Sequence, residues 1–174
     1  RGEFLTAYTP YQPEVSQGML QAMWEFQTLI SELVGLPIAN LSLYDGSTAA
    51  AEALTCAVRV HNRKATQPNT VYVSALTSPD KLSVMHNYCQ GAEIEIRMLA
   101  HNEDGTLDLD ALTAAAGSCG VYLEQPNPVG VLDEGLTTVK DIIGDDTALI
   151  VGVQPIALGV VEAPGHYGAD IVVG

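Results

Sequence analysis

Six residues in a row, Ala148 to Val153, carry no polar side chain. An apolar run of this length is typical of a strand buried on both faces, as in a parallel sheet covered by helices. Shorter β-rich or alternating segments occur elsewhere, and helical patterns lie between them. We expect the other strands at residues 41–44, 70–75, 93–98, 120–123 and 169–173. The alternation predicts an α/β fold with a mostly parallel sheet between helices.

The first helix is predicted from apolar spacing. The residues Met19, Met23, Phe26, Ile30 and Leu33 recur at intervals of three and four, which places them on one helical face. Pro13 suits the beginning of this helix, and Gly35 with Pro37 suits its end. A second start signal, Ser78-Pro79-Asp80, predicts a helix to about Gly91. Further helices are expected at residues 48–64, 109–116 and 137–143.

In a parallel sheet the loops after the strands meet at one edge, and a ligand is expected there. Four loops should share that edge: residues 44–48, 76–79, 124–130 and 154–168. Neither a repeat nor an interdomain linker interrupts the 174 residues, so we expect a single α/β domain over 1–174. The chain begins without a methionine and stops directly after the apolar run 171–173, so we expect a fragment of a longer protein.

Composition narrows the classes of partner. The formal net charge of −14 argues against nucleic acid or an anionic membrane as a partner. No apolar run approaches the length of a membrane span. The three cysteines lie far apart with no CxxC spacing, which predicts reduced thiols in the cytoplasm. The four histidines form no HxxxH or HExxH pair, so no metal site is expected.

The stretch Leu41 to Leu54 joins a short apolar strand, a turn at Asp45-Gly46, two hydroxyls and an alanine-rich helix. A helix that begins just after a strand can hold a phosphate at its N-terminus. Ser47 or Thr48 can equally well cap the helix, since every helix needs a cap. Asp45 argues against a phosphate because its charge would repel an anion. Both interpretations stay open, with the cap preferred.

Other site motifs are missing. The sequence has no GxGxxG, no GxxxxGK[ST] and no GxSxG, which argues against a dinucleotide site, a Walker loop and a hydrolase elbow. Pyridoxal phosphate needs a lysine for its covalent link and an acid against its ring nitrogen. The lysines are Lys64, Lys81 and Lys140, and none is expected at the end of a strand. The sequence therefore predicts that this chain does not hold the cofactor covalently.

Four blocks, taken in order, resemble one family. They are residues 1–18, which include Thr6-Ala7-Tyr8-Thr9-Pro10-Tyr11-Gln12-Pro13, then Glu25-Phe26-Gln27-Thr28, residues 44–53 and residues 164–174. Together they are similar to the glycine cleavage system P-protein, glycine dehydrogenase (decarboxylating). The similarity is to subunit 1 of the two-subunit form, equivalent to the N-terminal half of the one-chain form.

The resemblance implies the fold-type-I pyridoxal-phosphate architecture and the decarboxylation of glycine, with transfer of the aminomethyl group to the lipoylated H-protein. It also implies a hetero-oligomer in which the lysine that binds pyridoxal phosphate belongs to subunit 2. This chain would then supply no catalytic residue and would be inactive alone. The absence of a suitably placed lysine agrees with that expectation.

The resemblance also implies site residues. The hydroxyls of Tyr8, Thr9 and Tyr11 and the amide of Gln12 are expected to face the cofactor or substrate across the subunit interface. Ser47 and Thr48 become an inherited phosphate cradle whose present work is to cap the helix and brace the interface. Two positions depart from the family pattern: Ser78 stands where a histidine is usual, and Gln154 where an aspartate is frequent.

Two alternatives remain. The chain could be a structural partner that shapes the interface without contacting a ligand. It could also belong to another fold-type-I enzyme, such as an aminotransferase or a desulfurase relative.

Overall fold

The computed structural model describes residues 9–62 and 68–174, and the chain divides into two compact units, Arg1–Ser42 and Leu43–Gly174. Tyr8 and Lys64 lie outside the described residues. The single domain expected over residues 1–174 stays a prediction.

The unit Arg1–Ser42 is built on helix α1 (Gln17–Val34). The predicted helix is confirmed, but its start at Pro13 is wrong by four residues. The backbone N–H groups of Val15 and Ser16 both donate to the carbonyl of Gln12, which closes a turn before the helix begins. The predicted end is confirmed: Gly35 has φ 72° and donates its N–H to the carbonyl of Ser31.

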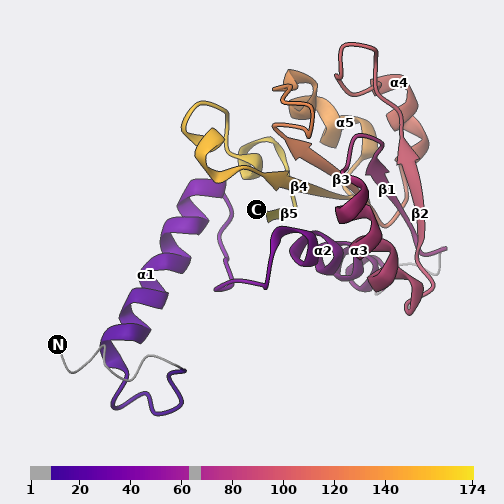
Figure 1. Ribbon diagram of the computed structural model, residues 1–174. Helices are drawn as coiled ribbons and strands as arrows, with labels where there is room; N and C mark the ends of the chain where they lie inside the picture. The colour runs from indigo at the N-terminus through magenta and orange to yellow at the C-terminus, as the bar shows by residue number, and fades with distance from the viewer. Residues whose placement is uncertain (1–8, 63–67) are drawn as a thin grey trace. The chain divides into compact units, whose positions relative to one another are not determined.

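The unit Leu43–Gly174 contains a five-stranded sheet in which every pairing is parallel (Figure 1). The strand order is β2-β1-β3-β4-β5. Their bounds are β1 Thr70–Ser74, β2 Glu95–Leu99, β3 Gly120–Gln125, β4 Ala148–Val153 and β5 Ile171–Val173. Strand β2 lies on one side of β1 and β3 lies on the other, so the sheet has a topological switch point between β1 and β3. The predicted α/β class is confirmed.

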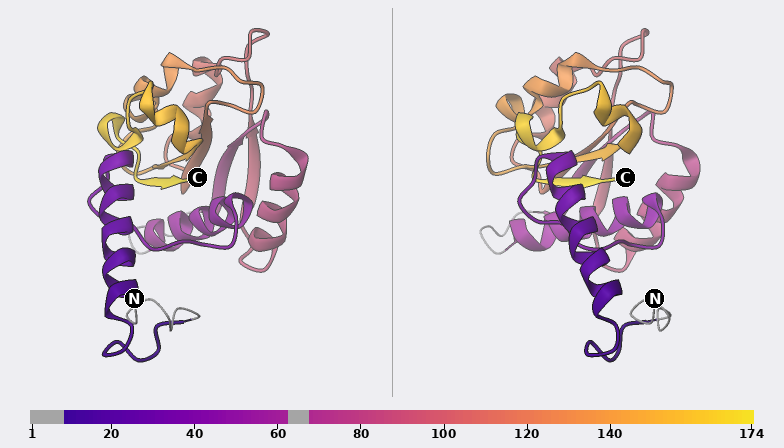
Figure 2. Two further views of the ribbon diagram at one scale, coloured as in Figure 1. Left: turned by 60° about the vertical axis from the view of Figure 1, so that its left-hand side comes forward. Right: turned by 90° about the vertical axis from the view of Figure 1, so that its left-hand side faces the viewer.

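Helices cover both faces of this sheet. Helices α2 (Gly46–His61) and α3 (Pro79–Gln90) lie side by side on one face, whereas α4 (Leu109–Leu112) and α5 (Val139–Ile143) lie on the other (Figures 1 and 2). Short 3-10 helices extend the connections: η2 Thr113–Ala115, η3 Glu134–Thr138, η4 Pro155–Gly159 and η5 Pro164–Tyr167. The result is a three-layer α/β arrangement.

Successive residues of the central strands point to opposite sides, and both sides are buried. Val71, Val73 and Ile150 pack in the cluster beneath α2 and α3, whereas Val121 and Leu149 pack in the cluster on the other face. All five are fully buried. The two covered faces explain why these strands are apolar without interruption.

Two further local predictions are wrong, one on a strand and one on a helix cap. The described chain has no strand at 41–44, where Leu41 and Leu43 are about two-fifths exposed and no sheet neighbour pairs with them. The helix expected at 109–116 is present as α4 followed by the 3-10 helix η2, and the helix expected at 137–143 is present as the end of η3 followed by α5. Neither Ser47 nor Thr48 caps α2, because Asp45 is the N-cap residue and Ser47 and Thr48 lie in the first turn.

The start of α3 is as predicted, since the Ser78 hydroxyl accepts the backbone N–H of Lys81 and Pro79 is the first helical residue. Cys56, Cys89 and Cys119 are all free thiols. Across the described residues, no helix is both long and apolar enough to cross a membrane. In the same residues no three His, Cys, Asp or Glu side chains are grouped so as to hold a metal ion.

Candidate functional site

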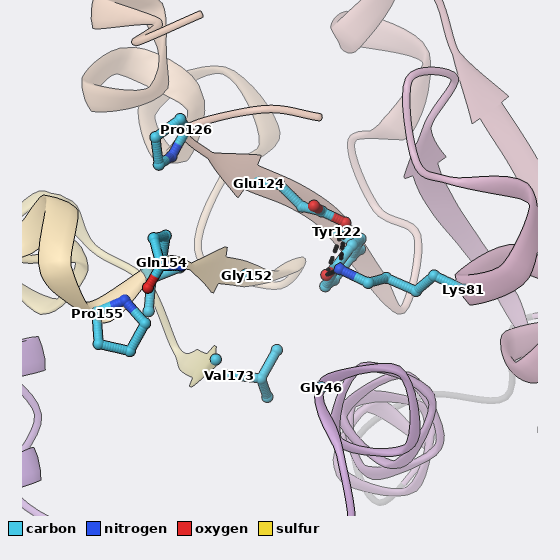
Figure 3. A pocket seen from close by; sticks show the side chains of 11 residues that line it. Gly46, Lys81, Tyr122, Glu124, Pro126, Gly152, Gln154, Pro155 and Val173 are labelled. Carbon is cyan, nitrogen blue, oxygen red and sulfur yellow. Dashed lines mark hydrogen bonds and ion pairs between the residues drawn. The ribbon is translucent and has the colours of Figure 1, made fainter. Parts of the chain in front are cut away.

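A cavity of about 310 Å³ opens at the carboxyl ends of β3 and β4, inside the unit Leu43–Gly174 (Figure 3). Its walls come from the start of α2, the first turn of α3, three neighbouring strands and the loops that follow them. The lining residues are Gly46, Lys81, Tyr122, Glu124, Pro126, Gly152, Val153, Gln154, Pro155, Val173 and Gly174. Loops 44–48, 124–130 and 154–168 all contribute, so the predicted edge for a ligand contains this cavity.

Lys81 carries the positive charge of the cavity. It lies in the first turn of α3, and its side chain extends toward β3 (Figure 3). The Lys81 Nζ lies 2.8 Å from Glu124 Oε1 and 3.4 Å from Tyr122 Oη. The ammonium group is also 5.9 Å from the centre of the Tyr122 ring, at the limit of a cation–π contact. One cation therefore joins a carboxylate and a phenol.

Tyr122 and Glu124 point to the same side of the sheet because they are two residues apart on β3. Tyr122 is fully buried, and its Oη donates to Glu124 Oε1 at 3.0 Å. Burial, followed by the charge of Glu124, raises the pKa of Tyr122 far above its usual value. The phenol therefore keeps its proton and donates to the carboxylate at every physiological pH.

The Lys81–Glu124 ion pair is largely, but not completely, shielded from solvent. The two side chains are 22% and 13% exposed. Charges in such a place have lost much of their hydration, so each depends on the other for compensation. The cluster of Lys81, Tyr122 and Glu124 is a preformed polar wall of the cavity.

Gly152 leaves room for this cluster. A Cβ at position 152 would lie 2.5 Å from Tyr122 Oη and 3.1 Å from Glu124 Cγ. Gly152 pairs with Glu124 in the β3–β4 ladder, so its missing side chain lies directly opposite that carboxylate. The glycine in the apolar run 148–153 is thus explained by a close approach of neighbouring side chains.

The N-terminus of α2 reaches the cavity through Gly46. Just before it, Asp45 accepts the backbone N–H of Thr48 at 2.8 Å on Oδ1 and the Thr48 hydroxyl at 3.1 Å on Oδ2. The backbone hydrogen bond from Thr48 is the main cause that lowers the pKa of Asp45. The end of the helix that would attract an anion is already occupied by a carboxylate of the chain itself.

A buried polar network fixes the loop after β3. Asp133 accepts the backbone N–H groups of Leu107 at 2.6 Å and Gly135 at 2.8 Å. Gln125 accepts the N–H of Asp133 at 3.1 Å and donates to its carbonyl at 3.2 Å. Asn127 bonds to the backbone of Gly105, Val129 and Val131. This network holds the rim of the cavity next to Pro126.

The predicted site residues fall in different places. Thr9, Tyr11 and Gln12 lie in the unit Arg1–Ser42 and are all exposed, with Tyr11 at 83%. Ser47 and Thr48 lie in the first turn of α2, next to the cavity residue Gly46. Their contact with a ligand stays a prediction.

The two departures from the family pattern can also be located. Ser78 caps α3 by accepting the N–H of Lys81, and Gln154 lines the cavity and caps η4.

Lys140, the other described lysine, forms an ion pair with Asp170 at 2.7 Å and donates to the carbonyl of Thr147 at 3.0 Å.

Sequence reasoning missed the charged cluster. It placed Lys81 correctly in a first turn but took that position to exclude the lysine from the sheet edge. Tyr122 and Glu124 could have been found from the period of two along β3, which puts both on the face that α3 covers. The length of a lysine side chain then lets a residue on α3 reach the end of the neighbouring strand.

The whole chain, residues 1–174, matches the family model described as glycine cleavage system P-protein. The chain belongs to this family. It is 53% identical, over its full length, to the probable glycine dehydrogenase (decarboxylating) subunit 1 of Thermococcus onnurineus. The protein of the same description from Thermoplasma acidophilum is 46% identical over 98% of the chain. The chain spans 38% and 39% of the lengths of these two P-protein relatives.

Solved structures agree with the family. A crystal structure of glycine decarboxylase (P-protein) of the glycine cleavage system, in an inhibitor-bound form, is 40% identical with a TM-score of 0.86. That match covers 99% of this chain and 38% of the solved one. An L-threonine transaldolase from Pseudomonas fluorescens is 20% identical with a TM-score of 0.66, covering 89% of this chain and 35% of its own, and shows a shared fold alone. The fold is thus that of fold-type-I pyridoxal-phosphate enzymes.

Proposed function

We propose that this chain is part of a glycine decarboxylase of the glycine cleavage system. The whole enzyme would release carbon dioxide from glycine and pass the aminomethyl group to the lipoyl group of the H-protein. The observation that carries the proposal is the likeness to the P-protein structure over nearly the whole chain, in both sequence and fold. Pyridoxal phosphate would supply an electron sink while the carboxyl group leaves.

The cofactor would be held covalently by a partner chain, glycine dehydrogenase subunit 2, in a hetero-oligomer. Support comes from the two lysines that the structure describes. Lys81 and Lys140 are both engaged by carboxylates, Glu124 and Asp170. An ammonium group in an ion pair has no free lone pair with which to attack an aldehyde. A cytoplasmic location, expected from the reduced thiols, is part of the same proposal.

The segment before α1 would form a wall of the shared site. Thr9, Tyr11 and Gln12 direct hydroxyl and amide groups outward from a compact turn, where the N–H of Tyr11 donates to the carbonyl of Thr9 at 2.8 Å. Among the described residues, none hydrogen-bonds to these three side chains, which leaves them available to a ligand or a partner surface. Tyr8, which lies outside the described residues, would belong to the same wall.

The proposed reaction is tested by reconstitution. We expect the full-length protein that contains this chain to catalyse glycine-dependent exchange of labelled carbon dioxide only when subunit 2, pyridoxal phosphate and lipoylated H-protein are present. Activity of the chain's own protein without subunit 2 would contradict the assignment of the lysine to the partner. Absence of exchange from a correctly assembled mixture would contradict the reaction itself.

The site wall is tested by removing two hydroxyls. In the reconstituted enzyme, the double variant Tyr8→Phe/Tyr11→Phe should lower kcat/KM for glycine at least about tenfold, because polar contacts to the reacting groups are lost. Tyr88→Phe is the matched control, since Tyr88 lies in the last turn of α3 and does not line the cavity, and it should leave the rate unchanged.

The same double variant also tests the alternative that this chain is only a structural partner. A chain that only shapes the interface would show weaker assembly with subunit 2 but an unchanged rate once assembled. Measuring kcat at saturating subunit 2, with the assembled fraction from analytical ultracentrifugation, distinguishes the two roles. An unchanged rate in the assembled enzyme would rule out the wall.

A further inference from the structure

Pyridoxal phosphate makes three demands on a protein. Its phosphate needs backbone donors and positive potential, which a helix N-terminus supplies. Its aldehyde needs a neutral lysine amine, and its ring nitrogen needs an acidic partner. The cavity at the ends of β3 and β4 offers a candidate for each demand: the start of α2, Lys81 and Glu124. Each of the three is already engaged within the chain.

The phosphate position is filled by Asp45. Its two carboxylate oxygens accept the backbone N–H and the hydroxyl of Thr48, at 2.8 Å and 3.1 Å. These are donors that a phosphate at this helix end would need. The charge adds to the obstacle, because a phosphate dianion here would lie beside a carboxylate that its hydrogen bonds keep ionised.

The amine position is filled by an ion pair. Glu124 Oε1 binds the Lys81 ammonium at 2.8 Å and accepts the Tyr122 hydroxyl at 3.0 Å, and these two donors lie 3.4 Å from each other (Figure 3). A lysine must lose its proton before it can attack an aldehyde. Releasing Lys81 would leave Glu124, which is 13% exposed, without its counter-charge.

The ring-nitrogen position lacks a free acid. Glu124 is the only carboxylate among the described residues that line the cavity, and Lys81 already neutralises it. On the β4 side the lining is Gly152, Val153 and the amide of Gln154. An amide carries no charge that could stabilise a protonated pyridine ring. The residues present do not fit the cofactor.

We infer that the residues at this cavity do not fit pyridoxal phosphate: Asp45, just outside the lining, occupies donors at the start of α2, and Glu124 and Tyr122 hold the only lysine that lines the described cavity. The lysine is present but engaged, because Lys81 reaches the cavity and Glu124 and Tyr122 hold its ammonium group there. The inference does not depend on the proposed decarboxylation, because it concerns only the fold and this cavity.

The test is reductive labelling of the full-length protein without subunit 2. When a lysine amine condenses with the aldehyde of pyridoxal phosphate, water leaves and a C=N bond forms. Sodium borohydride reduces that bond to a stable secondary amine. We expect peptide mass spectrometry to find Lys81 labelled only at background in the wild type, and at least tenfold more in Asp45→Asn/Glu124→Gln. Both substitutions keep the shape of the side chain and remove its charge.

The controls fix the meaning of each result. Lys81→Met/Asp45→Asn/Glu124→Gln must lose the label at this position, and equilibrium dialysis of the wild type against pyridoxal phosphate should retain no cofactor. Labelling of Lys81 or retained cofactor in the wild type would overturn the inference, and that measurement needs no variant. No gain of label in the folded double variant, with folding checked by circular dichroism, would overturn it as well. Neither result uses glycine decarboxylation, so failure of the proposed function remains distinguishable.

Discussion

Replacing Asp133 with alanine is expected to lower the free energy of unfolding by about 2–4 kcal/mol, because it removes the acceptor of two backbone N–H groups at once. The side chain of Asp133 is 6% exposed, and it bonds to Leu107 at 2.6 Å and to Gly135 at 2.8 Å. Leu107 is 3% exposed, so water cannot replace the lost acceptor there without opening the loop. Urea-induced unfolding of the full-length protein measures the change.

Asp104→Ala is the matched control for this variant. Asp104 also accepts two hydrogen bonds, both from Thr106, but it is exposed and water can take its place. We expect a clearly smaller loss of stability than for Asp133→Ala. Equal losses in the two variants would show that burial of the Asp133 network does not set its contribution. Asp133→Asn should fall between them, since an amide retains one acceptor oxygen for the two donors.

Replacing Gly152 with alanine is expected to lower the free energy of unfolding by about 1–3 kcal/mol, the usual cost of overpacking a core. The added Cβ would lie 2.5 Å from Tyr122 Oη, closer than non-bonded atoms approach. Tyr122 is fully buried and hydrogen-bonded to Glu124, so neither side chain can move without breaking the charged cluster. Thermal unfolding followed by circular dichroism measures the loss.

Gly91→Ala provides the control for Gly152→Ala. Gly91 has φ −69°, and an added Cβ there would meet no atom within 4 Å. The substitution should leave stability unchanged or raise it slightly, because alanine restricts the unfolded chain. A loss at Gly91 as large as that at Gly152 would mean that steric contact with Tyr122 is not the cause.

The fold was largely predictable from local patterns. The run 148–153, the cap at Ser78 and the end at Gly35 all appear in the structure where the sequence places them. Each depends on neighbours within a few residues, so the chain itself records it. The prediction failed at 41–44, where an apolar alternation has no sheet partner, because pairing depends on residues elsewhere in the chain.

The helix start at α2 shows how the same stretch supports two interpretations. Ser47, Thr48 and Asp45 are all suitable cap residues, and propensity alone does not rank three neighbours. In the structure Asp45 is the N-cap residue, because its backbone is extended at φ −160° and the helix begins at Gly46. The choice of the acidic residue sets the sign of the charge at this end of the cavity.

The sequence by itself determined the succession of strands and helices along the chain from residue 70 onward, the burial of both sheet faces and the family to which the chain belongs. Only the tertiary structure decided what the cavity contains. Lys81 is 41 residues from Tyr122 and 43 from Glu124, and they meet because β1 and β3 are neighbours in the sheet. Strand order is a long-range property, set by packing rather than by local pattern. The sequence therefore places Lys81 in the first turn of a helix, and only the tertiary structure shows that its side chain lines the cavity.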